Sequence, residues 1–168
     1  MTINDLMRQF SMNDRNQGST ILSACSSVFL RFALGCSFLS AVADRFGLWG
    51  AFGRPHVAWG TFARFIAYTG QLNWFLPKAM IPVLAVAATI AETLLGILLL
   101  LGWQTRTAAL LSGVLLLLFA VTMTAALGIK APLDFSVFSA SGGALFLAST
   151  TEYPFSVDQL QRDSVRHS

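Results

Sequence analysis

Residues 79–129 read AMIPVLAVAATIAETLLGILLLLGWQTRTAALLSGVLLLLFAVTMTAALGI. Two apolar runs, 79–103 and 107–129, are separated only by a short polar turn within GWQTR. Each run is long enough to cross a hydrocarbon core as a helix, which takes about 20 apolar residues. Because a turn this short makes neighbouring helices antiparallel, the stretch predicts a helical hairpin through a bilayer.

Two further apolar runs flank this hairpin, one at 21–44 and one at 132–151. Pro132 stands where a helix can begin without losing a hydrogen bond. The 168-residue chain is 55% hydrophobic and 11% charged, whereas soluble domains carry about 25% charged residues. We therefore predict an all-α integral membrane protein, a four-helix up-down bundle over 21–151 with both termini on one side.

The segments outside these runs are more polar. The start, MTINDLMRQF, lacks the apolar core of a signal peptide, so we expect the first span to be retained. Residues 1–20 predict either a short amphipathic helix on the membrane surface or a frayed tail, and 152–168 a polar tail. The connection 46–77 is apolar but too interrupted to span, so we expect a helix near 57–69 at the interface or folded back over the bundle.

Arg31 and Glu92 are the charges in the middle of predicted spans. A lone charge there costs about 2.5–3.5 kcal/mol on insertion scales. Counted from the same membrane surface, both residues lie about ten positions deep, or roughly 15 Å at 1.5 Å per residue. We therefore expect a buried Arg31–Glu92 ion pair. Two interpretations stay open: the pair fixes helix register, or it faces a polar cavity that handles a proton or small ligand.

A second polar group falls near the opposite surface. Asp44 and Arg45 end the first run, and Lys130 and Asp134 flank the last turn. Charges at span ends are usually solvated anchors. The alternative is an outer polar mouth that also includes His56 of the long connection.

Several other classes are disfavoured. The basic residues form no cluster with interleaved aromatics, so nucleic acid is not an expected partner. Histidine is absent from the predicted spans and no Cys/His/carboxylate cluster has zinc spacing, so we expect no haem and no metal. Five basic residues fall on each predicted side, which leaves orientation open. Ser139 and Gly143 predict close helix packing or, alternatively, a homodimer face.

The order of three motifs resembles the DoxX family of small bacterial membrane proteins. These motifs are RFALG at 31–35, AETLLGILLLLGWQTRTAA at 91–109 and GIKAPLDFSVFSAS at 128–141. The resemblance implies four spans in the bacterial inner membrane with both termini cytoplasmic. The family takes its name from a subunit of an archaeal thiosulfate:quinone oxidoreductase, and some members are associated with redox complexes that handle thiol stress. The resemblance carries over no catalytic residues.

Three functions follow as hypotheses. The first is a membrane subunit of a redox complex that binds quinone, with a soluble or peripheral oxidoreductase partner supplying electrons because the chain has no intrinsic cofactor motif. The second is a non-catalytic membrane scaffold or assembly factor. The third, a small-solute permease, has the least support, since there is no repeated broken helix.

Overall fold

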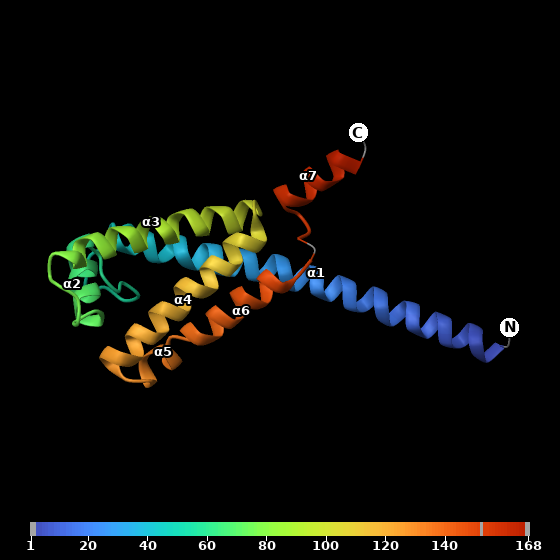
Figure 1. Ribbon diagram of the computed structural model, residues 1–168, viewed down its shortest axis with the longest axis horizontal. Coiled ribbons are helices and arrows are strands. Elements are labelled where there is room, and N and C mark those ends of the chain that lie inside the picture. The colour runs from blue at the N-terminus through green and yellow to red at the C-terminus, as the bar shows by residue number, and fades with distance from the viewer. Residues whose placement is uncertain (1–2, 152, 167–168) are drawn as a thin grey trace.

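Helix α1 (Ile3–Arg45) is one uninterrupted helix in the computed structural model of the protein, which describes residues 3–151 and 153–166 (Figure 1). At 1.5 Å per residue its 43 residues extend about 65 Å, about twice the thickness of a hydrocarbon core. The segment apolar enough to span is Ile21–Arg45. The predicted boundary near residue 20 is therefore absent, because the preceding stretch holds no proline and a single helical glycine costs only about 1 kcal/mol.

The predicted hairpin is confirmed as α3 (Met80–Leu101) and α4 (Thr105–Leu127), both long and apolar enough to span a membrane. The helix α3 ends at Gly102, whose φ of +67° lies in the left-handed region that glycine adopts most readily. Its N–H donates to Leu99 O at 3.2 Å, and the next N–H, of Trp103, donates to Leu98 O at 3.1 Å. These bonds stop the helix and reverse the chain within a few residues.

The predicted fourth span, 132–151, is not one continuous helix. It is divided into α5 (Lys130–Asp134) and α6 (Val137–Ser149), with Ser136 at a φ of +54° between them. Of the helices that the structure describes, three are long and apolar enough to span a membrane, and α6 is a shorter apolar helix of 13 residues. The hydropathy pattern gave no sign of this break, because Asp134 and Ser136 are single polar residues within an otherwise apolar run.

The long connection contains the expected helix, with shifted bounds, as α2 (Phe62–Leu72). Thr61 caps it, since its side chain accepts a hydrogen bond from Arg64 N at 3.4 Å. The C-terminal residues form a last helix, α7 (Val157–Arg166). Helix α7 and the N-terminal part of α1 both project beyond the same end of the bundle, opposite the end that carries α2 (Figure 1).

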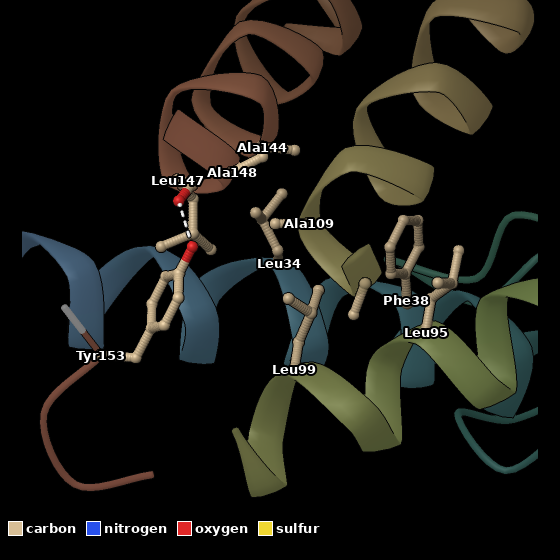
Figure 2. Packing of buried hydrophobic residues seen from close by; sticks show 10 residues of the cluster. Leu34, Phe38, Leu95, Leu99, Ala109, Ala144, Leu147, Ala148 and Tyr153 are labelled. Carbon is tan, nitrogen blue, oxygen red and sulfur yellow. Dashed lines mark hydrogen bonds between the residues drawn. The ribbon is translucent and has the colours of Figure 1, made fainter. Parts of the chain in front are cut away.

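The core lies where α1, α3, α4 and α6 meet. Helix α1 packs chiefly against α3, and α4 against α6. Figure 2 shows Tyr153 at the edge of this core, where its hydroxyl donates a hydrogen bond to Leu147 O at 3.2 Å. The buried apolar residues of this cluster are Leu34, Phe38, Leu95, Leu99, Ala108, Ala109, Ala144, Leu147, Ala148 and Tyr153.

Small residues set the closest helix approaches. A Cβ atom on Gly35 of α1 would lie 3.0 Å from Gly96 O of α3, so glycine lets these two backbones touch. On α6, Ser141 is buried and donates to Gly113 O of α4 at 2.8 Å. This contact supports the packing interpretation of the small residues in 132–151, while the homodimer face stays a prediction.

Candidate functional site

Glu92 of α3 is held by Arg45, the last residue of α1. Arg45 Nη2 lies 2.7 Å from each oxygen of the Glu92 carboxylate, and Nη1 donates to Thr89 Oγ1 at 2.8 Å. Thr89 donates in turn to Ala85 O at 2.8 Å. The side chains of Arg45 and Glu92 are both about 2% exposed. The pair therefore lies inside the bundle, where either charge alone would be costly.

The predicted Arg31–Glu92 pair is wrong. The helix contact places Gly35 beside Leu100, so Arg31, one turn earlier on α1, lies level with the end of α3 and not with Glu92. Side chains also lean toward the N-terminus of their own helix. Because α1 and α3 are antiparallel, this lean moves the Arg31 side chain away from Glu92 and brings the Arg45 side chain toward it. Comparing only how deep each Cα atom lies in the membrane does not account for this lean.

Aromatic rings cover the Arg45–Glu92 pair. The guanidinium carbon of Arg45 lies 3.7 Å from the ring centre of Phe65 in α2 and 5.4 Å from that of Trp59. The two rings contact each other edge to face at 5.1 Å. Arg45 Nε is buried and has no hydrogen-bond partner among the described residues. The first connection therefore folds back over the bundle, as one of the two interpretations of the sequence predicted.

Asp44 fixes the loop that leads to this cover. Its Oδ2 accepts hydrogen bonds from the N–H groups of Ala58 and Trp59 at 2.9 and 3.0 Å, and its Oδ1 accepts one from Gly60 at 3.3 Å. Three consecutive amides directed at one carboxylate form an anion-holding turn. At the end of α1, Asp44 therefore binds the loop and its neighbour Arg45 binds α3.

A surface hollow opens beside Asp44, between α1 and the loop. Trp49 lies on one of its sides and donates from Nε1 to Ser40 O at 3.1 Å. His56 lines it from the loop with a φ of +68°, a left-handed conformation uncommon outside glycine. The residues lining the hollow are Cys36, Ser37, Ser40, Ala41, Asp44, Trp49, Pro55, His56, Ala58 and Trp59.

Arg31 closes the other end of the bundle. It is fully buried, and its Nε donates to Leu99 O at 3.1 Å while Nη1 donates to Pro154 O at 2.9 Å. Nη2 donates to Phe155 O at 3.1 Å and to Leu100 O at 3.4 Å. Arg31 therefore joins α1, the end of α3 and the segment that precedes α7. Its charge is balanced by peptide dipoles at a helix C-terminus, where cations are favoured.

The profile of the DoxX family matches residues 26–125, which is more than half of the chain. The chain belongs to the DoxX family. The region that the family profile covers includes Arg31, Arg45, Glu92 and the hollow, whereas α5, α6 and α7 lie beyond it. No curated protein and no solved structure matches the chain.

The predicted outer polar mouth is only partly assembled in this DoxX family member. Asp44 and His56 line the hollow together, and Arg45 is buried behind it. Lys130 and Asp134 pair with each other on the exposed surface of α5 and do not line the hollow. Their exposure agrees with the first of the two interpretations, that charges at the ends of spans are solvated anchors.

Sequence reasoning missed Arg45 as the partner of Glu92, and with it Thr89 and Phe65. A usable signal was present, because Thr89 lies one turn before Glu92 and so shares its helix face. Among the side chains that the structure describes, no group of three or more His, Cys, Asp or Glu is placed to hold a metal ion. The chemistry that the site offers is hydrogen bonding, charge and aromatic contact.

Proposed function

We propose that this protein is a membrane subunit of a redox complex, and that the hollow beside Asp44 holds the headgroup of a membrane quinone. The observation that carries the proposal is the lining of the hollow. Two tryptophans, a histidine and two serines line one space beside the Asp44 carboxylate, although one of these tryptophans, Trp59, also contacts Phe65 and Arg45. Most ligand sites combine aromatic walls with a few polar groups in this way.

The lining fits a quinone ring chemically. A quinone is flat and apolar on its faces, and its two carbonyl oxygens accept hydrogen bonds. The rings of Trp49 and Trp59 offer surfaces for stacking. The side chains of Ser37, Ser40 and His56 carry potential donors that bond to nothing else in the described part of the chain.

Access from the lipid supports the same ligand. Cys36, Ser37 and Ser40 are exposed on the outer face of α1, close to the end of a segment apolar enough to span a membrane. The neighbouring Leu48 and Trp49 are 78% and 59% exposed. A lipid-soluble molecule diffusing in the membrane would reach the hollow sideways, without passing through the bundle.

The roles of the groups in the hollow follow from their contacts. Asp44 is already bonded to three amides, so it shapes the wall and keeps the loop in place. His56 brings an imidazole to the hollow, and the two ring nitrogens of an imidazole can donate and accept a hydrogen bond, which suits it to pass a proton to or from a quinone oxygen. We place the bundle, including α6, in the inner membrane with both termini in the cytoplasm. Electrons would then come from a peripheral oxidoreductase partner at the opposite end of the bundle, which carries α2 and the hollow.

Quinone binding tests the proposal directly. Protein purified in mild detergent is extracted with organic solvent, and the quinone recovered is measured per protein chain. A short-chain quinone is then titrated back while tryptophan fluorescence is recorded. We expect saturable quenching that is reduced in Trp49→Phe and Trp59→Phe and preserved in Trp103→Phe, because Trp103 lies at the far end of α3.

A His56→Ala variant gives a second readout. It should weaken quinone binding several-fold while leaving the unfolding transition unchanged, since His56 is exposed and bonds to nothing in the described chain. Absence of quinone from the extract together with non-saturable quenching would refute the proposal.

A non-catalytic scaffold is the second candidate, and one observation favours it. Arg31 and Arg45 are both buried. The hydrogen bonds of each side chain join separate segments of the chain. Crosslinking in membranes followed by affinity purification separates the two functions. A co-purifying oxidoreductase together with bound quinone supports the redox subunit, whereas a partner of another class without quinone supports the scaffold.

A further inference from the structure

A second hollow lies at the opposite end of the spans, between the first turn of α4 and helix α7. It is independent of the quinone proposal, because it shares no residue with the hollow beside Asp44. Its position is fixed on two sides: Arg31 bonds the segment before α7, and Asp158 N donates to Gly102 O at 3.0 Å. The residues lining it are Gln104, Thr105, Arg106, Thr107, Tyr153, Asp158, Gln161, Arg162 and Val165.

The charges of this hollow favour an anion. Arg106 and Arg162 line it, against the single carboxylate of Asp158. That carboxylate is already engaged, since its oxygens accept hydrogen bonds from Gln104 N and Thr105 N at 2.8 Å each. The Arg106 guanidinium makes no hydrogen bond or ion pair with any group that the structure describes, whereas Arg162 Nη1 donates to Thr151 O at 3.0 Å. Among the described residues that line it, the hollow therefore carries one more positive charge than negative charge.

The backbone adds further donors. The N–H groups of Arg106 and Thr107, in the first turn of α4, donate to no group in the part of the chain that the structure describes. A helix N-terminus with unpaired N–H groups attracts anions through its dipole and through direct hydrogen bonds. Asp158 occupies the first two amides of this turn, and the next two are left to a ligand.

A buried hydroxyl at the same turn is also without a partner. Thr105 lines the hollow, is 0% exposed, and its Oγ1 makes no hydrogen bond among the described residues. Buried polar groups are nearly always paired, so an unpaired one calls for an explanation. Because Thr105 Oγ1 has no accessible surface, a ligand in the hollow would reach it only after a local shift of this turn.

We propose that the hollow between α4 and α7 binds a phosphate group through Arg106, Arg162 and the first turn of α4. Arginine matches the geometry of phosphate oxygens with paired donors. Basic pockets at the ends of membrane spans commonly receive lipid headgroups, and the nearby Trp103 is 48% exposed, as suits a residue in the headgroup layer. The phosphate belongs either to an anionic lipid or to a soluble phosphate ester, and the chemistry of recognition is common to both.

The test uses the full chain purified in detergent. Dissociation constants are measured by native mass spectrometry for phosphatidylglycerol and phosphatidylcholine, and by thermal shift for inorganic phosphate. Arg106→Gln and Arg162→Gln should each weaken binding about tenfold, the usual effect of losing a charged hydrogen bond. The matched control is Arg54→Gln, which removes the same charge from an exposed position at the other end of the molecule.

The outcomes separate the two sources. Phosphatidylglycerol binding that exceeds phosphatidylcholine binding and is lost in both variants assigns the phosphate to a lipid. Saturable inorganic phosphate binding without a preference between the lipids assigns it to a soluble ester. The proposal is overturned if neither ligand saturates, or if both arginine variants match Arg54→Gln.

Discussion

Removing Arg45 and Glu92 singly and together measures what their buried pair contributes. Arg45→Met leaves the Glu92 carboxylate buried without its cation, and Glu92→Leu leaves the Arg45 guanidinium without its anion. Breaking a buried ion pair on one side costs about 3–5 kcal/mol. The contacts with Phe65 and Trp59 that Arg45 also makes contribute about 0.5–2 kcal/mol.

The double variant should recover most of the loss. With both charges gone, no desolvated charge remains, and the residual cost is mainly that of the lost cation–π contacts, about 2 kcal/mol. The two single costs sum to at least about 6 kcal/mol, so the coupling energy is about 4 kcal/mol or more. Reversible unfolding in mixed detergent micelles, followed by far-ultraviolet circular dichroism, gives each free energy.

The control pairs Glu92→Leu with Arg31→Met. These residues share no partner, so their costs should add to within about 0.5 kcal/mol. Additive costs for Arg45 and Glu92, or strong coupling between Arg31 and Glu92, would refute the assignment of the pair. A charge exchange between Arg31 and Glu92 should likewise restore nothing.

Three further substitutions probe the ends of the bundle. Gly102→Ala places a Cβ 2.6 Å from Arg31 Nη2 in a left-handed conformation, so it should cost about 1–2 kcal/mol in backbone strain alone and should speed proteolysis of residues 153–165. Gly128→Ala also strains the backbone, since Gly128 has a φ of +85°, but it has open space around it and should not speed that proteolysis. Asp158→Asn should lower the free energy of unfolding by about 1 kcal/mol, because a charged cap of α4 becomes neutral. Asp44→Asn removes the charge that three amides share, and hydrogen exchange at residues 58–60 should accelerate by about tenfold or more.

The fold was predictable where hydropathy and turn chemistry act together. The runs that became α3 and α4 are continuous and are separated by Gly102, so their bounds follow closely from the sequence. The break at Ser136 was not predictable, because single polar residues such as Asp134 also occur within unbroken spans, as Glu92 does in α3. Neither was the continuous start of α1, since its polar residues suit a solvent-exposed helix as well as a tail.

The site was predictable in its residues but not in its pairing. Arg31, Asp44, Arg45 and Glu92 all stand out as charges in or beside apolar runs. Which of them meet depends on helix register and on the lean of each side chain, and the positions of Gly35 and Gly96 determine that register only once α1 and α3 are packed. The contact between Arg31 and the C-terminal segment could not be predicted either. Arg31 binds backbone carbonyl groups of that segment, and every residue has such a group whatever its side chain.

The contacts of Arg31 have a consequence for how the protein is made. Two of its acceptors, Pro154 O and Phe155 O, follow Arg31 by 123 and 124 residues and are synthesised correspondingly later. Arg31 enters the membrane with α1, so its guanidinium lacks these two acceptors until that later segment has been made. A truncated chain that ends before Pro154 would leave Arg31 permanently without these two acceptors. We expect such versions to be recognised by membrane quality-control proteases, although every membrane-spanning helix would be intact.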